Sequence, residues 1–505
     1  MNKSIDLVFL WHMHQPDYRD YSSGDFLLPW VYLHAIKDYT DMAYHLEQHP
    51  KMKVVVNFVP VLLDQLEDYQ QQFATGKIRD PLLRLLAKEN LNDVSDVERD
   101  LIIESCFRSD HNKMVAPYPF YKRLSDLFKL VETGGNVAIS YLSGQYLADL
   151  LTWYHLAWCG ESVRREHALV INLMSKDENF TYADRKQLLD LIGSSVSGII
   201  PRYRKLAERG QIELSSTPHY HPLAPLLIDL HSARESQPGS SLPQSQSYPG
   251  GRDRVQTQLL QAMESHQERF GERPQGIWPA EGAVSTELLN VLAEQGCRWT
   301  ASGETVLVNS LNHKHLPVSD QKHYLYRPYR LQGTANAIHC FFRDDRLADL
   351  IGFEYSNWNG QDAALHFVTQ LQVISKQFVE GEKPLVSVIL DGENAWEYYP
   401  YNGYHFLNDL YSILEAHHTI STTTYRDYLN QREASGNLDF AKEGELPGLV
   451  AGSWVYGTFS TWIGSPDKNH AWDLLCAAKQ KYDMVMAAGR LNDEEQQAAV
   501  CAVLV

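Results

Sequence analysis

Acidic side chains gather directly after the apolar segment 386–390 of this chain. The sequence VSVILDGENAWEYY places Asp391, Glu393, Trp396 and Glu397 within a few positions of that segment. A strand that is buried on both faces and ends in carboxylates is how a parallel α/β barrel presents catalytic groups to a substrate. The alternative is a strand followed by an acidic turn that caps a helix. The stretch predicts an enzyme that acts on a polar substrate with flat apolar faces.

A further carboxylate stands in the same kind of setting. In GIWPAEGAVS, residues 276–285, a short apolar segment is followed by Trp278 and Glu281, and a helical pattern begins near Ser285. Ser285 can cap that helix and Glu287 supplies an acidic residue in its first turn, so the helix does not require Glu281. Glu281 is therefore either a surface turn residue or a site carboxylate.

Two histidine pairs follow strand-like segments. His12 and His14 end the opening segment of the chain, and His219 and His221 follow the segment 212–215. Residues at i and i+2 of a strand point to the same side, so each pair can reach one pocket. Neutral imidazoles bind zinc or iron in many metal-dependent barrel hydrolases. The same side chains can also donate hydrogen bonds to sugar hydroxyls or bond to backbone carbonyls, so the residues alone leave these alternatives open.

The chain resembles glycoside hydrolase family 57, whose members act on α-glucans. Five short motifs occur in the order found in that family, and the resemblance spans residues 5 to 475: HQP at 14–16, STPHYHP at 216–222, WPAEGAVS at 278–285, LDGENAWEYY at 390–399 and GSWVYGTFSTWIG at 452–464. The resemblance implies that Glu281 is the nucleophile and Asp391 the general acid/base. It also implies that the chemistry uses no catalytic metal and no other cofactor.

The chemistry of glycosidic cleavage agrees with that assignment. One carboxylate must attack the anomeric carbon while a protonated carboxyl supports the leaving oxygen, at a separation of about 5–5.5 Å in retaining enzymes. Glu281 and Asp391 would both rise at the C-terminal face of a barrel, and we expect a raised pKa at Asp391 with the charge of Glu281 as one cause. Glu393 competes for the second role, but Gly392 makes a continued strand doubtful. We therefore expect Glu393 and Glu397 to cap or to hydrogen-bond.

Several aromatic side chains in the motifs are candidates for sugar-binding walls. The chain has 11 Trp and 28 Tyr, and an indole can stack on a pyranose while its N–H reaches a hydroxyl. Core packing is the alternative for each of the four candidates, which are Trp278, Trp396, Trp454 and Trp462. The segment 232–254 is rich in Ser, Gln, Pro and Gly, which predicts a mobile lid that brings Arg252 to the site, or else a solvated linker.

Composition limits the remaining possibilities. A chain of 505 residues is expected to form two or three domains. The net charge of −18 argues against a nucleic-acid partner and fits a neutral substrate. No apolar segment approaches the roughly 18 residues of a membrane span, and no signal peptide is recognisable, so a cytoplasmic location is expected. The six cysteines form no CxxC pair, so they predict neither a disulfide scaffold nor a zinc site, and the oligomeric state stays open.

The predicted elements alternate between strands and helices. Strand-like segments occur at 5–11, 53–60, 212–215, 276–279, 298–301, 337–342 and 384–390, and the pattern over about 80–205 is helical, which predicts a helical insertion. The family resemblance implies an α/β fold with an incomplete (β/α)7 barrel over residues 1–402 and an α-helical domain over 403–505 that completes the cleft. The last residues, 493–505, stop inside an apolar helical pattern without a cap, which predicts a truncated C-terminus.

These features together predict a retaining α-glucan hydrolase of the α-amylase type that cleaves α-1,4-glucosidic bonds. Transglycosylation is open, because a sugar can intercept a covalent glycosyl-enzyme in place of water. The sequence does not choose between α-amylase, amylopullulanase, 4-α-glucanotransferase and branching enzyme. Two alternatives are a metal-dependent carbohydrate deacetylase or amidohydrolase that uses the histidine pairs, and a non-catalytic α-glucan-binding protein.

Overall fold

A computed structural model of the chain describes residues 4–135, 139–319, 322–331, 338–379, 381–436, 443–492 and 495. Seven parallel strands of this described part close into a barrel, in the order β1–β2–β3–β4–β5–β7–β8, and pairing of Arg343 with Ser387 joins β7 to β8. The strands are β1 (Ile5–Met13), β2 (Val54–Phe58), β3 (Ile212–Ser216), β4 (Gly276–Ile277), β5 (Trp299–Gly303), β7 (His339–Arg343) and β8 (Leu385–Asp391). The predicted α/β class and seven-stranded barrel are confirmed.

Apolar side chains on both faces explain why these strands lie in the interior. Every residue of β1 and β2 is buried, as expected for parallel strands that are covered by helices outside and by packed side chains inside. The register sets His12 of β1 opposite Asn57 of β2 and Asp391 of β8. The pairing of the strands therefore already brings three polar side chains to one end of the barrel.

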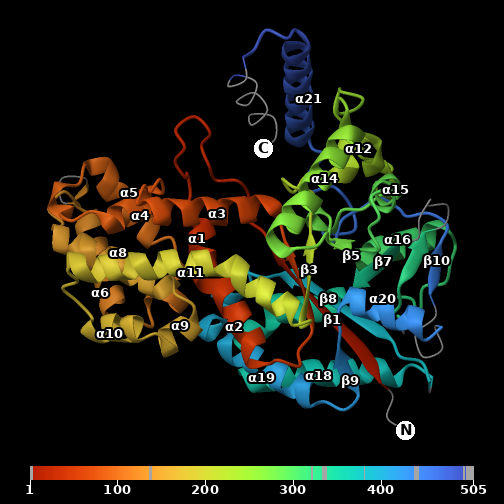
Figure 1. The fold of residues 1–505 in the computed structure, drawn as a ribbon, viewed down its shortest axis with the longest axis horizontal. Coiled ribbons are helices and arrows are strands. Elements are labelled where there is room, and N and C mark those ends of the chain that lie inside the picture. Colours follow the sequence, from red (N-terminus) through yellow and green to blue (C-terminus); the bar gives the residue numbers. More distant parts are fainter. Residues whose placement is uncertain are drawn as a thin grey trace.

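A lobe of helices lies between β2 and β3 and extends to one side of the barrel (Figure 1). The long helix α11 (Tyr182–Glu208) returns the chain to β3 and carries a capping box in which Thr181 bonds the N–H of Asp184. Helices α1 (Trp30–His34) and α2 (Thr40–Gln48) precede β2, and the lobe itself contains α3 (Pro60–Thr75), α4 (Pro81–Ala87), α5 (Asp96–Cys106), α6 (Pro119–Glu132), α8 (Gly144–Trp158), α9 (Glu161–Glu166) and α10 (Ala168–Lys176).

The second half of the barrel has shorter connections. They contain α12 (Ala224–Ile228), α13 (Ala233–Ser236), α14 (Gly251–Phe270), α15 (Thr286–Glu294), α16 (Glu304–His313), β6 (Tyr329–Leu331), α17 (Asp345–Asp349) and α18 (Gly360–Lys376). Asp473 accepts hydrogen bonds from the N–H groups of Gln244 and Ser245 at 3.1 and 2.7 Å. The segment predicted as a lid or linker is thus held against the helix that carries Asp473.

The sheet continues beyond residue 402. After α19 (Tyr404–Ala416), strand β9 (Ile420–Thr422) pairs with β1, and after α20 (Tyr425–Ala434), strand β10 (Gly444–Leu446) pairs with β6. Side chains of α20 also join the cluster that fills the barrel. The expected boundary at residue 402 therefore does not separate the sheet from a helical domain.

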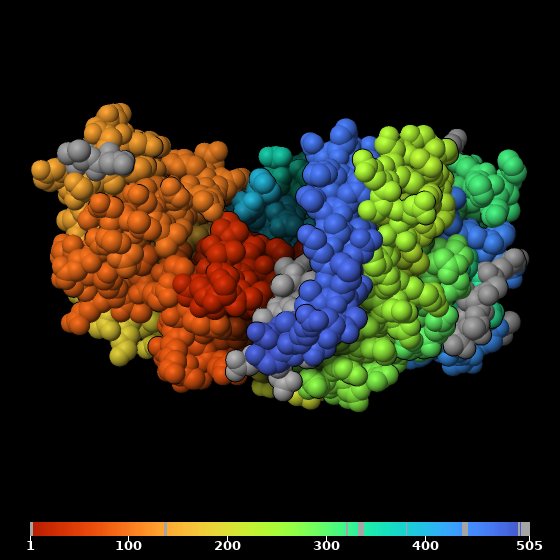
Figure 2. All heavy atoms as spheres, turned by 90° about the horizontal axis from the view of Figure 1, so that it is seen from above, coloured from red at the N-terminus to blue at the C-terminus, as the bar shows by residue number. Residues whose placement is uncertain are grey.

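Helix α21 (Pro466–Ala487) ends the regular structure of the described residues. Figure 2 shows it lying across the molecule between the N-terminal segments and the segments near α12 and α14. The predicted apolar pattern at 493–505 lies outside the described residues, apart from Glu495. Among the described helices, none is long and apolar enough to cross a membrane.

Candidate active site

Glu281 lies in a short 3-10 turn directly after β4. Its backbone is left-handed, with φ 55° and ψ 28°, a conformation that is uncommon for a residue other than glycine. The carbonyl oxygen of Glu281 accepts hydrogen bonds from Ser453 Oγ at 2.7 Å and from the N–H of Trp454 at 3.2 Å. The chain near residue 453 thus fixes the turn, and strained backbone held in this way is typical of functional sites.

Among the described residues, Trp454 and Asp391 act on the carboxylate of Glu281. Its Oε2 accepts a hydrogen bond from Trp454 Nε1 at 3.1 Å. Burial raises the pKa of Glu281, the Trp454 hydrogen bond opposes that rise, and the charge of Asp391 adds to it. The two predicted catalytic carboxyls therefore interact electrostatically.

Asp391 is the last residue of β8. Its Oδ2 accepts a hydrogen bond from Asn394 Nδ2 at 2.9 Å. Burial raises the pKa of Asp391, while the Asn394 hydrogen bond and electrostatic interactions with His14 and with the Arg343 guanidinium oppose the rise. The direction agrees with the expectation from the sequence but the cause is burial, because the repulsion between the two carboxyls acts on the pKa of Glu281.

Glu393 turns away from solvent toward the end of β1. Its Oε1 accepts hydrogen bonds from the N–H of His14 at 3.0 Å and from Gln15 Nε2 at 3.3 Å. Burial and the charge of Asp391 raise the pKa of Glu393 well above its ordinary value. The predicted hydrogen-bonding role of Glu393 is confirmed.

Three histidines meet next to Asp391. Among the described residues, ring nitrogens of His12, His14 and His221 lie within 4.8 Å of one another, and the rings of His14 and His221 stack at 3.8 Å. His12 Nδ1 lies 2.7 Å from Asn57 Oδ1 and its Nε2 lies 3.2 Å from His221 Nε2. If Nδ1 of His12 donates to Asn57, then Nε2 of His12 accepts from His221.

The three imidazoles are neutral at neutral pH. Burial lowers the pKa of His12 to about 4 and that of His14 to about 3, and it lowers the pKa of His221 well below its ordinary value. Neutral nitrogens that converge could hold a divalent ion. They could equally exchange hydrogen bonds with the hydroxyls of a sugar, so the geometry accommodates both alternatives.

His219 does not join this cluster. Its Nε2 bonds Asp64 Oδ2 at 2.8 Å, and Asp64 Oδ1 accepts from Arg269 Nη2 at 2.7 Å. The expectation that His219 and His221 point to the same side is wrong, because β3 ends at Ser216 and His221 has a left-handed φ of 56°. Strand alternation does not apply to a chain that has left the strand.

The four candidate tryptophans fall into different surroundings. Trp454 packs edge-to-face on Trp278 at 5.0 Å, and Trp278 is fully buried. Trp396 is also buried, against Trp11, and its Nε1 donates to the Gly392 carbonyl at 2.8 Å. Trp278 and Trp396 thus support the loops that carry the carboxylates, and neither presents a free ring face.

The other two predicted binding residues, Trp462 and Arg252, are partly buried and contact neighbouring elements. Trp462 is half-buried in a separate apolar cluster, and its carbonyl accepts from Trp472 Nε1 at 3.0 Å. Arg252, in the first turn of α14, pairs with Glu294 of α15 at 2.8 Å. In the structure, Arg252 is thus bound to a neighbouring helix. Its predicted role in substrate binding would require the ion pair with Glu294 to break.

Comparison with protein families identifies the family of this chain. The protein-family model described as Glycosyl hydrolase family 57 matches residues 8–441 of the chain. The chain belongs to this family. The resemblance inferred from the five motifs is confirmed.

Solved structures of low sequence identity share the fold of this family 57 chain. It is similar to a branching enzyme of the same family from the hyperthermophilic archaeon Pyrococcus horikoshii, with 16% identity and a TM-score of 0.56 over 95% of this chain and 78% of that one. It is similar to an α-amylase from Thermotoga maritima, with 12% identity and a TM-score of 0.53 over 97% and 83% of the two chains. It is also similar to a 4-α-glucanotransferase from Thermococcus litoralis, with 15% identity and a TM-score of 0.50 over 99% and 55%. No curated protein sequence matches the chain significantly.

The candidate active site includes two polar residues, Arg343 and Asn57, that were not predicted from the sequence. Arg343 ends β7, and its guanidinium lies 5.0 Å from the ring centre of Trp454. Asn57 orients His12, and its Nδ2 donates to Ser215 Oγ at 2.9 Å. Each had a visible signal, because Asn57 is a polar residue inside the apolar segment VVVNF and Arg343 follows directly on a strand-like segment.

Proposed function

We propose that the protein is a retaining glycoside hydrolase that cleaves α-1,4-glucosidic bonds in starch-like or glycogen-like α-glucans. The observation that carries the proposal is the placement of Glu281 and Asp391 after two parallel strands of one barrel, where the charge of one affects the pKa of the other. Membership of glycosyl hydrolase family 57 supports it. The similar solved structures include enzymes named for α-glucan chemistry, which favours this substrate class.

The roles follow from the chemistry of each carboxyl. Glu281, ionised, attacks the anomeric carbon while protonated Asp391 gives its proton to the leaving glycosidic oxygen, so a covalent glycosyl-enzyme forms and the leaving sugar departs as an alcohol. Asp391, now ionised, then removes a proton from water, whose oxygen attacks the anomeric carbon and frees Glu281. A sugar hydroxyl in place of water gives transglycosylation. The raised pKa of Asp391 favours its protonated starting form.

Product analysis tests both the substrate and the stereochemistry. We expect maltoheptaose and amylose to give shorter maltooligosaccharides whose first-formed anomer, followed by NMR before mutarotation, is α. Pullulan separates an amylopullulanase from an α-amylase, and longer or branched products from maltoheptaose indicate a transferase. A first product with the β configuration would overturn the retaining mechanism.

Variants of the two carboxyls distinguish their roles. Glu281→Gln should abolish turnover because no glycosyl-enzyme can form. Asp391→Asn should lose about 10²–10⁴-fold on a natural glucan, as for loss of general acid/base catalysis. Azide should partly restore the Asp391→Asn variant on a substrate with an activated leaving group, because azide attacks without base assistance. If azide restored the activity of Glu281→Gln but not that of Asp391→Asn, the assignment of the two roles would be contradicted.

A second candidate function rests on the histidine cluster. The convergence of His12, His14 and His221 suits a divalent ion, as a metal-dependent carbohydrate deacetylase or amidohydrolase would require. Our proposal predicts that glucan cleavage survives exhaustive chelation, because the imidazoles bind hydroxyls. Loss of activity in chelator with recovery on addition of zinc would favour the second candidate, and binding of maltooligosaccharides without any turnover would favour a non-catalytic glucan-binding protein.

A further inference from the structure

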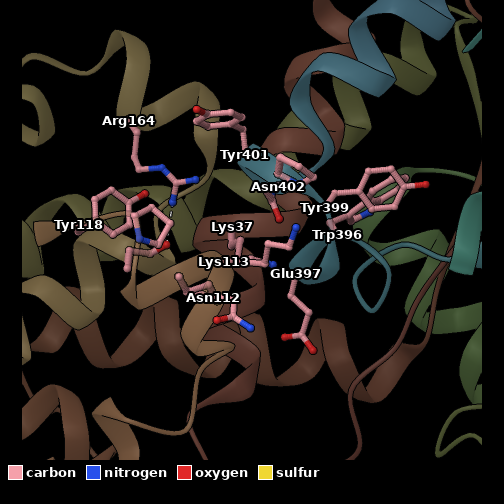
Figure 3. A pocket seen from close by; sticks show the side chains of 14 residues that line it. Lys37, Asn112, Lys113, Tyr118, Arg164, Trp396, Glu397, Tyr399, Tyr401 and Asn402 are labelled. Atoms are coloured by element: carbon pink, nitrogen blue, oxygen red, sulfur yellow. Dashed lines mark hydrogen bonds between the residues drawn. The ribbon is translucent and has the colours of Figure 1, made fainter. Parts of the chain in front are cut away.

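A cavity of about 350 Å³ lies beside the loop that follows Asp391, between the helical lobe and residues 396–402 (Figure 3). Figure 3 shows Arg164 and Tyr118 of the lobe on one side of it and Trp396 and Tyr399 of the loop on the other. Its volume falls within the roughly 300–1,000 Å³ that small-molecule sites occupy. Since Trp396 Nε1 bonds the Gly392 carbonyl, the cavity wall is joined directly to the residue after Asp391.

One buried polar atom on the cavity wall lacks a partner. Asn402 is only 6% exposed, and its Nδ2 donates to Asp41 Oδ2 at 2.9 Å. Its Oδ1 has no hydrogen-bond partner among the described residues. Buried acceptors are nearly always satisfied, because leaving one without a donor costs free energy. An acceptor of this kind on a cavity wall is suited to a hydroxyl or amide donor of a bound molecule.

The backbone of the loop beside this atom is strained at two residues that line the cavity. Tyr401 has φ 53° and Asn402 has φ 54°, and both lie in the left-handed region that favours glycine. Such backbone persists where neighbouring contacts hold it, often at ligand sites. Tyr401 is 59% exposed as a residue, and the Arg165 guanidinium lies 5.7 Å from the centre of its ring. The loop therefore offers an aromatic face at the rim and an acceptor inside.

Charge at the cavity is balanced. Two cations on its wall are paired with carboxylates, Lys37 with Asp38 at 2.7 Å and Arg164 with Glu161 at 2.8 Å. Lys113 and Glu397 add one charge of each sign to the lining. Figure 3 shows Lys37 and Lys113 near Asn402 in the middle of the view. A phosphate or carboxylate ligand would need an excess of positive charge, so the lining suits a neutral molecule with many hydroxyls.

We propose that this cavity is a second sugar-binding site, which takes a glucose unit of an α-glucan beside the catalytic loop. The inference rests on the proposed function for the class of sugar. Tyr118 and Tyr401 supply aromatic faces, Asn402 Oδ1 accepts from a sugar hydroxyl, and Asn112 and Lys113 donate to others. Occupation of the cavity would anchor a glucan chain next to Asp391.

Isothermal titration calorimetry with maltotriose tests this site in the full chain carrying Glu281→Gln, which prevents turnover. We expect two binding sites. Adding Tyr401→Ala or Lys113→Met should weaken one of them about tenfold or more, equivalent to about 1.4 kcal/mol. Tyr141→Ala is the matched control, because Tyr141 is 85% exposed elsewhere on the lobe and its loss should leave both sites intact.

The other outcomes separate failure of this site from failure of the proposed function. A single maltotriose site that His14→Ala removes, while Tyr401→Ala and Lys113→Met leave it unchanged, would overturn the cavity site alone. Absence of maltotriose binding at any site would overturn the proposed function together with this inference. Saturable binding of inorganic phosphate that Lys113→Met abolishes, without maltotriose binding at the cavity, would contradict the neutral ligand.

Discussion

The surroundings of Glu281 and Asp391 act on their pKa values in different ways. Burial raises the pKa of both carboxyls, but Glu281 has an indole donor that favours its ionised form and a neighbouring carboxylate that disfavours it. Asp391 instead has an amide donor and electrostatic interactions with His14 and the Arg343 guanidinium, which lower its pKa. Among the described residues, the hydrogen bond from Trp454 is the contact that lowers the pKa of Glu281, so changing this contact should change the pH dependence of activity.

Replacement of Trp454 by phenylalanine tests that contact. Loss of the indole N–H removes the interaction that lowers the pKa of Glu281, so that pKa should rise further. Since Glu281 must be ionised to attack, the acidic limb of the kcat/KM profile should move to higher pH. Trp462→Phe should leave that limb in place. An acidic limb that is unchanged or moved to lower pH in Trp454→Phe would show that this hydrogen bond does not control Glu281.

Sequence reasoning at the residue scale succeeded where a residue ends a strand and failed where the chain had left one. Asp391 was predictable as the polar end of a buried segment, and β8 does end at that residue. His219 and His221 share the same i and i+2 spacing as His12 and His14, yet the left-handed φ of His221 separates them. A backbone angle of that kind leaves no mark in a histidine, unlike a glycine at a turn.

At the scale of elements, strand β8 and the loop after it are joined to β1 through one buried carboxyl. Glu393 is 2% exposed, and its Oε1 accepts from the N–H of His14 and from Gln15. Its raised pKa means that the folded protein favours the protonated form. Stability from this group is therefore present below the ordinary glutamate pKa and decreases as pH rises through the folded-state pKa.

The variant Glu393→Gln should remove that pH dependence, because the amide resembles the protonated acid in shape and charge. We expect its unfolding free energy to gain about 1–3 kcal/mol relative to the wild type as pH rises from 4 to 8, the scale of a desolvated buried polar group. Urea unfolding at a series of pH values measures the difference. A constant difference across this range would show that Glu393 ionises in the fold as readily as in the unfolded chain.

The apolar character of a segment decided which strands were predictable. The seven strands of the barrel coincide with strand-like segments that are visible in the sequence, and the sequence predicts all seven. Strands β6, β9 and β10 have three residues each and alternate between buried and more exposed positions, so they resemble ordinary loops. Because β9 and β10 pair with distant strands, only the closed sheet shows that residues after 402 belong to it.

At the scale of the whole molecule, Asp41 links the barrel, the helical lobe and the active-site loop. This buried carboxylate on α2 accepts from the N–H groups of Glu161 and Ser162 at 2.7 and 3.0 Å, at the start of α9 in the lobe. It also accepts from Asn402 in the loop at 2.9 Å. The sequence predicted a helical insertion, but it contained no signal for this junction, because its members are more than a hundred residues apart.

Substitution of Asp41 by asparagine tests whether this junction holds the three parts together. The amide keeps the shape of the side chain but loses the charge and turns hydrogens toward donors, so the N–H groups of α9 and the side chain of Asn402 lose part of their bonding. We expect a loss of at least the roughly 1.5–3 kcal/mol of one charge-assisted hydrogen bond in urea unfolding, because several bonds are affected. Limited proteolysis should cut faster near α9 and residues 396–403, since both segments depend on the same carboxylate.

Asp100→Asn, at an exposed position of α5, should change neither measurement. Equal stability with faster cleavage in the loop alone would show that Asp41 positions Asn402 without holding the lobe, and no change in either would show that neighbouring packing fixes the junction.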